Sequence, residues 1–438
     1  MKSVASFALG CKVNQVESEA IAESFAEKGY KVVDINDKAD VYVINTCTVT
    51  NFGDKKSRQI IRRVKRQNPE AIVVVTGCYS QTAPEDIKKI DGVNIIIGTK
   101  GRNKVIEEVE KYKFENGIVE YVDSVKLEKV FEPISINKLM NRCRVYIKVQ
   151  DGCNQFCSYC IIPYARGPVR SREEESVINE VSTLAKNGFK EIVLTGIHVA
   201  SYGKDLPDTN LLKLIKKIHP IEGIERIRLS SVEPNIITED FMKEISVMKK
   251  MCHHFHLSLQ SGCDRTLKAM RRKYNTKKYI NAVETIRKYW SDAAISTDII
   301  VGFPGESEED FRESCELARN IKFAKIHVFP YSPKKGTDAE KMKNQIGAET
   351  KSKRSNILSK IGDYNAKEFI ESCIGENVDV LFEHEVGNNV YEGHTSNYIN
   401  VLAKSDKDIK NKILKVKLTG IDKDHALGEI VGRVKGGE

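Results

Sequence analysis

Long hydrophobic stretches are missing from this 438-residue sequence, in which no apolar run approaches the eighteen or more residues that a membrane span requires. The stretch from Met1 to Lys12 has only a short apolar run, which Gly10 interrupts, so it lacks the regions of a secretory signal peptide. The eleven cysteines are an odd number, which argues against a disulfide framework and for buried or metal-binding thiols. We therefore expect a cytoplasmic globular protein of two to four domains with no membrane partner.

Charge of one sign is also in only modest excess, with 70 Lys and Arg against 61 Asp and Glu and a formal net charge of +9. Such an excess permits a polyanionic partner such as nucleic acid, but many enzymes share it. Composition therefore does not indicate a function. The arrangement of the cysteines is more informative.

The most informative arrangement is a short loop in which three residues separate Cys153 from Cys157 and two separate Cys157 from Cys160. A [4Fe–4S] cube has four irons, so three thiolates leave one iron free to coordinate another molecule. A zinc knuckle or a chance cluster is the competing interpretation, but zinc sites usually have four protein ligands in paired spacings. The spacing resembles the signature of the radical S-adenosylmethionine (SAM) enzymes, in which the open iron holds SAM and the cluster splits it into methionine and a 5′-deoxyadenosyl radical.

Residues 1–112 alternate short β-branched runs with polar helical patterns, which predicts a parallel α/β sheet domain. The expected strands are Val4–Leu9, Val41–Thr46, Ala71–Thr76 and Val93–Ile97, and the clearest helices are Glu17–Lys28 and Lys55–Arg66. Each of the first three strands is followed by a cysteine: Cys11, Cys47 and Cys78. Open α/β sheets bind ligands at the carboxyl ends of their strands, so the three thiols could converge on one site. They could equally be unrelated buried thiols, and the pattern alone leaves both interpretations open.

The segment from Lys55 to Arg66 has seven basic residues in twelve. On a helix, its apolar residues Ile60, Ile61 and Val64 would form one stripe, with basic residues on a neighbouring face. That face is either simply solvated or a site for nucleic-acid phosphates. The candidates for phosphate contact are Arg58, Arg62 and Arg63.

From about residue 138 to 365 the sequence predicts six strand–helix units, two fewer than a closed barrel has. The strands are Arg144–Gln150, Glu191–Thr195, Arg226–Ser231, His254–Leu259, Ile295–Val301 and Lys325–Phe329. An incomplete (β/α)6 barrel would be open at its side, and its cysteine loop would lie at the carboxyl-end rim, where barrel enzymes keep their active sites. Candidate SAM-binding residues at this rim are Tyr159, Gly196, Glu233, Gln260 and Pro304.

Other residues with metal-binding side chains are interpreted as structural. Five histidines near these strands are more typical of core or hydrogen-bonding residues than of iron ligands: His198, His253, His254, His256 and His327. Five further thiols lack any shared spacing: Cys143, Cys252, Cys263, Cys315 and Cys373. Between the two domains, the segment from Phe114 to Leu139 is predicted to be a linker with a short hairpin.

The tail, residues 372–438, has four short strand-like runs separated by turn residues, which predicts a small all-β, OB-like barrel. The runs are Gly375–Phe382, Asn397–Ala403, Ile413–Thr419 and Gly428–Val434. Barrels of this kind often bind RNA, but acidic residues slightly outnumber basic ones here, so any binding face must be local.

Over nearly its full length the chain resembles the methylthiotransferases of the radical SAM superfamily. The motifs that carry the resemblance are Leu9–Gln15, Asn45–Cys47, Thr76–Cys78, the cysteine loop with Ile162–Gly167, and Leu259–Gly262. The resemblance implies an N-terminal methylthiotransferase domain (1–112), a radical SAM core (138–365) and a TRAM-type RNA-binding barrel (372–438). It also implies that Cys11, Cys47 and Cys78 hold a second, auxiliary [4Fe–4S] cluster beside that of Cys153, Cys157 and Cys160.

Within the family, the residues around Cys11 are most similar to the branch that methylthiolates carbon 2 of N6-threonylcarbamoyladenosine at position 37 of tRNA. The branches that act on isopentenyladenosine and on a ribosomal protein carry different residues after this cysteine. The implied reaction uses SAM as methyl donor and radical source on a tRNA anticodon stem-loop, with an electron donor of the flavodoxin or ferredoxin type and a separate sulfur source. A non-catalytic iron–sulfur RNA-binding protein is the alternative from another class.

The substrate branch has a chemical consequence, because a threonylcarbamoyl carboxylate needs cationic or hydrogen-bonding partners whereas an isopentenyl group needs an apolar wall. Near the expected site the sequence offers five polar residues for the carboxylate: Lys12, Asn14, Arg166, Arg170 and Arg172. The same residues could instead bind the SAM carboxylate or tRNA phosphates.

Overall fold

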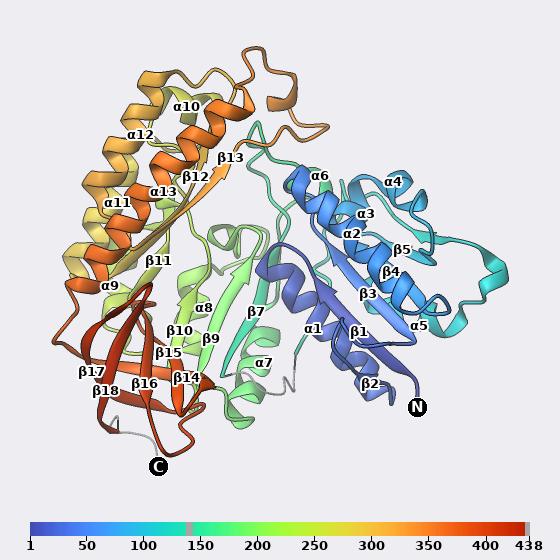
Figure 1. Ribbon diagram of the computed structural model, residues 1–438, viewed down its shortest axis with the longest axis horizontal. Helices are drawn as coiled ribbons and strands as arrows, with labels where there is room; N and C mark the ends of the chain where they lie inside the picture. The colour runs from blue at the N-terminus through green and yellow to red at the C-terminus, as the bar shows by residue number, and fades with distance from the viewer. Residues whose placement is uncertain (137–142, 434–438) are drawn as a thin grey trace.

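The computed structural model describes residues 1–136 and 143–433, which form a sheet domain, an open barrel and a small closed barrel (Figure 1). The start of the predicted central domain at residue 138 and the last residues of the tail, 434–438, lie outside the described residues. The α/β fold class, with an incomplete barrel and a C-terminal all-β barrel, is confirmed.

The N-terminal domain is a parallel sheet with the strand order β2-β1-β3-β4-β5-β6. Its strands are β1 (Ser3–Ala8), β2 (Lys31–Val32), β3 (Val41–Thr46), β4 (Ile72–Gly77), β5 (Ile95–Ile97) and β6 (Val119–Tyr121). Its helices are α1 (Lys12–Glu27), α2 (Asn51–Gln67), α3 (Cys78–Thr82), α4 (Pro84–Lys88) and α5 (Val105–Lys111). Side chains of α1 and α5 pack on one face of the sheet and those of α2 and α4 on the other, so both faces are covered.

Two details of this domain bear on the sequence predictions. Ile60, Ile61 and Val64 of α2 are buried, as their helical stripe predicted. The predicted hairpin in the 114–139 segment is wrong for its described part, because β6 pairs in parallel with β5 and extends the sheet. A three-residue edge strand has too little alternation for its pairing to be predicted from sequence.

The central barrel consists of six parallel strands: β7 (Arg144–Asp151), β9 (Glu191–Gly196), β10 (Arg226–Leu229), β11 (His254–His256), β12 (Ala294–Val301) and β13 (Lys325–Pro330). Ladders join β10-β9-β7 and β11-β12-β13, and isolated bridges such as Val232–Leu257 connect the two halves. The short β8 (Arg170–Ser171) pairs with β7 in the antiparallel sense. The barrel is thus open between its first and last strands, as predicted.

Helices cover the outside of the barrel, and a large apolar core fills the space between them and the strands. They are α7 (Glu174–Lys186), α8 (Leu211–Ile218), α9 (Glu239–Ser246), α10 (Asp264–Ala269), α11 (Thr276–Tyr289), α12 (Glu308–Ile321) and α13 (Ala348–Glu371). The short α6 (Ile162–Arg166) lies instead against α3 of the sheet domain. The last helix packs along β13 and α12, with the Asn365 side chain donating to the Ala318 carbonyl at 2.8 Å, and leads directly into the C-terminal barrel.

The C-terminal barrel is closed, with the strand order β14-β15-β16-β18-β17. Its strands are β14 (Asn377–Gly387), β15 (Val390–Thr395), β16 (Asn400–Lys404), β17 (Ile413–Asp422) and β18 (His425–Arg433). The sequence pattern did not indicate β15, because its inward positions are Tyr391, Gly393 and Thr395, and only the first of these is apolar and large. Gly393 is required there, since a Cβ would lie 2.4 Å from the Leu381 carbonyl oxygen of β14.

Two arginines of β10 hold the small barrel against the large one. Arg226 donates to the carbonyls of His394 and Asp379, and Arg228 donates to the Ser396 carbonyl at 2.9 Å and to Glu191 at 2.7 Å. Burial alone would raise the pKa of Glu191, but the neighbouring guanidinium groups outweigh it and lower that pKa to about 2.

A buried cluster of charges joins the sheet domain to the barrel. Glu17 of α1 accepts from Lys148 of β7 at 2.8 Å and from Arg166 of α6 at 2.9 Å. Asp151, at the end of β7, contacts the same two cations at 2.6 and 3.0 Å. Arg102 of the sheet domain also pairs with Glu17. Burial would raise the pKa of Glu17, but these cations hold it well below its usual value.

Replacing Glu17 by Ala should destabilise the protein, because it leaves Lys148, Arg166 and Arg102 buried with too little compensating charge. We expect a loss of about 3 kcal/mol, seen as a melting temperature lower by several degrees in calorimetry. Glu27→Ala, at the exposed end of the same helix, is the matched control and should melt like the wild type. Equal melting temperatures for the two variants would contradict a structural role for the charge cluster.

Candidate functional site

The three cysteines of the sheet domain meet at one edge of the sheet. Cys11 precedes α1, Cys47 follows β3, and Cys78 opens α3 directly after β4. Because β1, β3 and β4 are neighbours, their carboxyl ends lie side by side. A Cβ on Gly10 would lie 2.5 Å from the Cys47 Sγ, so only glycine fits before Cys11. Burial and the nearby thiols of Cys78 and Cys11 raise the pKa of Cys47 to about 12.

The second set lies on the loop after β7. Gly152 turns this loop with a φ of 71°, and a Cβ there would overlap the Pro168 carbonyl oxygen. Ser158 anchors the loop to the barrel by donating from its hydroxyl to the Ala269 carbonyl at 2.8 Å. Burial and the adjacent Cys157 thiol raise the pKa of Cys160 to about 12. The sequence thus predicted both the loop and its place at the carboxyl-end rim.

The spacing of the thiols bears on what they can hold. Among the described residues, neither cysteine set brings three ligand atoms within 4.8 Å of one another, as the ligands of one zinc ion would have to be. Buried thiols with raised pKa values stay protonated on their own, and coordination to metal deprotonates them. Three thiols spread along a rigid rim suit a multi-iron cluster better than a single ion.

Arg272 is a rim residue that contacts the cysteine loop and that the sequence alone did not indicate. Its Nη1 donates to the Cys157 Sγ at 3.2 Å, and its Nη2 donates to Glu233 at 2.6 Å. His198 contacts the other oxygen of Glu233 at 3.2 Å. A fixed guanidinium beside a thiolate offsets the negative charge of a cluster. Its neighbours Arg271 and Lys273 are also basic, so no sequence signal separated Arg272 from a solvated charge run.

The other rim residues lie where the barrel topology placed them, at the carboxyl ends of successive strands. Tyr159 packs edge-on against Phe303, with ring centroids 6.4 Å apart. Gln260 adopts a left-handed backbone with a φ of 70°, and Pro304 is buried. Beside Gly196 the space is already filled by Gln150, whose Oε1 would be 2.9 Å from a Cβ. Gly196 therefore serves local packing, and not only the approach of a ligand.

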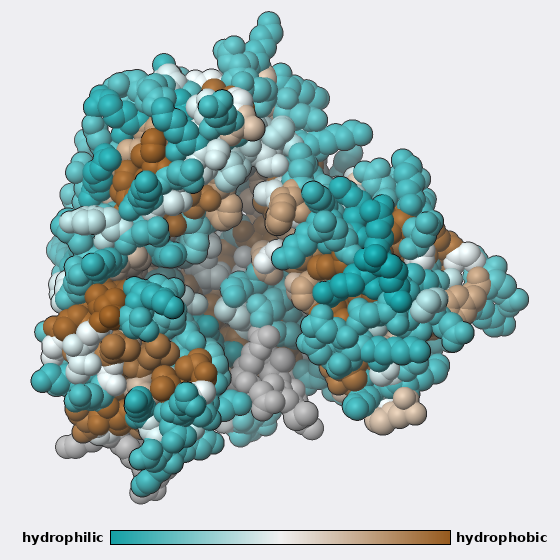
Figure 2. Space-filling view, viewed as in Figure 1, coloured by the Kyte–Doolittle hydropathy of each residue, from teal (hydrophilic) through white to brown (hydrophobic). Residues whose placement is uncertain are grey.

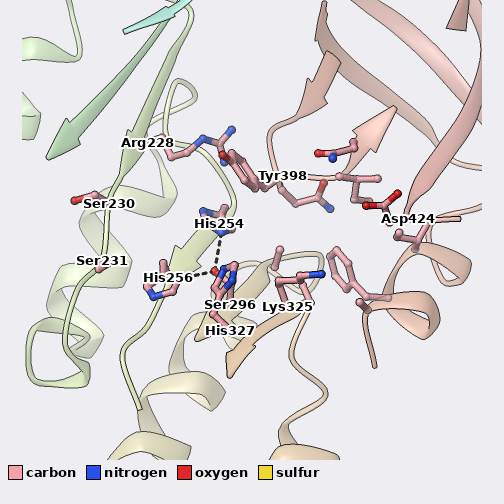
Figure 3. Close-up of a pocket in the computed structure, with 18 of the residues that line it drawn as sticks. Arg228, Ser230, Ser231, His254, His256, Ser296, Lys325, His327, Tyr398 and Asp424 are labelled. Atoms are coloured by element: carbon pink, nitrogen blue, oxygen red, sulfur yellow. Dashed lines mark hydrogen bonds between the residues drawn. The ribbon is translucent and has the colours of Figure 1, made fainter. Parts of the chain in front are cut away.

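A cavity of about 660 Å³ occupies the lumen of the open barrel (Figure 3), where the space-filling surface is hollowed between the sheet domain and the barrels (Figure 2). Lys12, directly after Cys11, lines it from the sheet domain, and Ser230 and Ser231 line it just below the rim residue Glu233. Tyr398 of the C-terminal barrel closes its lower end. The cavity therefore lies inside the barrel below the rim, close in sequence to Cys11 through Lys12 and to Glu233 through Ser231, and none of the six cysteines lines it.

The structure corrects the predicted polar residues for a substrate carboxylate. Arg166, Arg170 and Arg172 are all buried and committed to carboxylates, Arg172 to Glu180 and the other two to Asp151. Asn14 is buried as well, and its side-chain amide nitrogen donates hydrogen bonds to the Leu9 and Thr46 carbonyls. Of the five candidates, Lys12 alone lines the cavity. Charge counted along a sequence does not reveal which cations are already paired.

On the outer face of the sheet domain, α2 presents its basic side chains to solvent (Figure 2). Arg62 and Arg63 are exposed and form no ion pair within the described residues. Arg58 is partly buried, and its Nη1 donates to the Tyr79 hydroxyl at 2.8 Å. The three arginines thus share a helix, but only two of them are free to bind a phosphate.

Comparison with known proteins assigns the chain to a family. Residues 147–318 match the model described as Radical SAM superfamily, and residues 3–98 match the one described as Uncharacterized protein family UPF0004. The threonylcarbamoyladenosine tRNA methylthiotransferase MtaB of Bacillus subtilis (strain 168) is 42% identical over 95% of this chain and 94% of its own length. The chain belongs to the radical SAM methylthiotransferase family. It is therefore a transferase that acts on tRNA and uses SAM with an iron–sulfur cluster.

Two further comparisons concern the substrate branch and the fold. The tRNA-2-methylthio-N(6)-dimethylallyladenosine synthase of Clostridium tetani (strain Massachusetts / E88) is 37% identical over 94% of this chain and 92% of its own length. The radical SAM methyltransferase TsrM of Kitasatospora setae has a TM-score of 0.56 with 16% identity over 75% of both chains, which shows a shared fold. In the residues that the structure describes, every helix is too short or too polar to pass through a lipid bilayer.

Proposed function

We propose that this methylthiotransferase modifies carbon 2 of N6-threonylcarbamoyladenosine at position 37 of tRNA. The observation that carries the proposal is the presence of two separate three-cysteine sets, one at the strand ends of the sheet domain and one on the loop after β7 at the barrel rim. The name of the Bacillus subtilis relative, which matches nearly the full length of the chain, supports the same substrate. The reaction would take place in the cytoplasm, where tRNA is modified.

Each cysteine set would hold one [4Fe–4S] cluster, Cys153, Cys157 and Cys160 at the barrel rim and Cys11, Cys47 and Cys78 on the sheet domain. When bound, the clusters and SAM supply the methylthio group and the radical that removes hydrogen from carbon 2, a position that no side-chain base could deprotonate. The residues of the chain fix the geometry.

At the rim, Arg272 donates to Cys157, and at the other set Arg166 donates to the Cys78 Sγ at 3.3 Å. These bonds hold the thiolates in place and offset their charge. Tyr159, Gly196, Glu233, Gln260 and Pro304 would position SAM.

The tRNA would be held outside the cavity by its backbone and by bases near the target. Arg62 and Arg63 of α2 offer phosphate contacts. Phe156 and Tyr164 are about half exposed beside the rim, with their rings 5.9 Å apart, and offer surfaces on which splayed loop bases can stack. The C-terminal barrel would add contacts to the stem. An electron donor of the flavodoxin or ferredoxin type and a sulfur source would complete the reaction.

Two alternatives remain open to experiment. The Clostridium tetani relative favours an isopentenyl-type adenosine as substrate. A non-catalytic iron–sulfur RNA-binding protein would use the clusters without cleaving SAM. Incubating the reduced, cluster-loaded protein with SAM separates catalysis from mere binding, because only a radical enzyme releases 5′-deoxyadenosine.

The two-cluster arrangement predicts about eight irons per chain after full reconstitution. Replacing Cys153, Cys157 and Cys160 by Ala should remove about half of the iron and all SAM cleavage. Replacing Cys11, Cys47 and Cys78 should remove the other half and leave SAM cleavage partly intact. Cys373→Ala, a thiol at the end of α13, is the control and should keep all the iron. A triple variant that retained the full iron content would refute the assignment of that set.

The basic helix predicts a salt-dependent contribution to tRNA binding. Replacing Arg58, Arg62 and Arg63 by Ala should weaken binding and flatten the plot of log affinity against log salt by roughly one counterion for each phosphate contact that is lost. The matched control removes three exposed lysines from the barrel exterior, Lys249, Lys277 and Lys278. If both triple variants bind tRNA alike, α2 is only a solvated surface.

The substrate is tested directly by offering the enzyme two tRNA pools, one with threonylcarbamoyladenosine and one with isopentenyladenosine at position 37. With SAM, a reductant and a sulfur source, we expect methylthiolation of the threonylcarbamoyl pool, measured by mass spectrometry of the nucleosides. Modification of the isopentenyl pool alone would exclude the proposed substrate while leaving the methylthiotransferase family unchanged.

A further inference from the structure

The last barrel strand, β13, contributes two polar side chains to the cavity wall. Lys325 and His327 lie two residues apart, so both face the lumen of the barrel. Figure 3 shows them around the same space as His256 and Ser296, which come from the two preceding strands. Neither residue belongs to a cysteine motif, and the methylthiotransferase reaction as described above uses neither.

Most other charged groups in this wall already have partners. Arg228 binds Glu191 at 2.7 Å, and His256 contacts Asp298 at 3.2 Å through one ring nitrogen and Ser296 at 3.1 Å through the other. Two more cations of the wall pair with carboxylates outside it, Arg144 with Glu383 and Lys367 with Glu371. These charged groups therefore stabilise the wall itself through the partners that they already have.

The remaining lysines of the wall are uncompensated. Within the described residues, Lys325, Lys12 and Lys423 have no carboxylate at ion-pairing distance. The wall's own carboxylates are Asp363 and Asp424, and the second of these pairs with His425 at 3.0 Å. The cavity thus has an excess of positive charge, and this would attract an anionic occupant.

His327 adds a hydrogen-bonding group to this excess of positive charge. Burial lowers its pKa, so its ring is neutral near pH 7 and can donate one hydrogen bond from one nitrogen. Its ring centroid lies 5.8 Å from that of His256, whose Nδ1 is hydrogen-bonded to Ser296 and whose Nε2 lies 3.2 Å from Asp298. No hydrogen bond occupies the His327 ring within the described residues, so it can turn a donor toward an occupant.

We propose that this cavity receives the substituent on N6 of the target adenine, and that Lys325 and His327 bind its carboxylate. This inference rests on the proposed function and deepens it, since it assigns the choice between a carboxylate-bearing and an apolar substituent to β13. A charge-assisted hydrogen bond from Lys325 at the cavity wall favours the carboxylate, while an isopentenyl group would gain nothing from either residue.

The test compares two anticodon stem-loops that differ by one charge and one methyl group, one with threonylcarbamoyladenosine and one with the neutral methyl ester of its carboxylate. The wild-type enzyme should prefer the acid by about tenfold or more in kcat/KM, mainly through KM. In Lys325→Ala and His327→Phe this preference should fall toward one. Lys325→Arg, which keeps the charge, should retain most of it, and Lys277→Ala on the barrel exterior should retain all of it.

The outcomes separate the carboxylate site from the proposed function. Formation of 5′-deoxyadenosine without RNA should be the same in all variants, which shows that they are folded and loaded with cluster. A wild-type enzyme that modifies acid and ester equally, or variants that keep the full preference, would overturn the carboxylate site alone. A wild-type enzyme that modifies neither stem-loop, but does modify isopentenyl tRNA, would overturn the proposed function itself.

Discussion

The buried ionic cluster between α1 and β7 is the constraint on which the arrangement of the whole active region depends. Glu17 lies six residues after Cys11 on the same helix, and Asp151 lies two residues before Cys153. Lys148 binds both carboxylates, so one cation ties together the elements that carry the two cysteine sets. Because an uncompensated charge in this interior is very costly, the two domains cannot slide relative to each other without losing these bonds. The separation of the cysteine sets is thereby fixed before any substrate binds.

Such a cluster is a poor way to gain stability, since apolar side chains of the same size would serve as well or better. Its value here is positional. Arg166 contacts Glu17 and Asp151 with its guanidinium and also donates to the Cys78 Sγ, so the group that orients the domains also orients a thiol. The proposed reaction at an adenine carbon would require accurate placement of the two cysteine sets, and a rigid, densely paired network provides it.

Much of this was predictable from the sequence, because the relevant signals are local. Alternating apolar runs located the barrel strands to within a few residues, and the position of three cysteines directly after strands indicated that they could converge at one edge of the sheet. What the sequence could not supply was pairing. Arg166, Arg170 and Arg172 look available in a list of residues, yet their partners are remote in the chain. Arg272 was missed for the converse reason, since its contact with Cys157 spans 115 positions.

The C-terminal barrel has a second role that its sequence alone did not suggest. Tyr398 lies on the connection between β15 and β16, and its ring stacks on that of His254 with centroids 4.7 Å apart. The guanidinium carbon of Arg228 lies 4.6 Å from the centroid of the Tyr398 ring. The domain that we propose contacts the tRNA stem is therefore also the floor of the cavity for the modified base. Glu191 holds Arg228 in place, so any movement of the small barrel on RNA would be transmitted to the cavity floor through these contacts. Under the proposed function, one docked domain would therefore both contact the tRNA stem and help to shape the cavity for the N6 substituent.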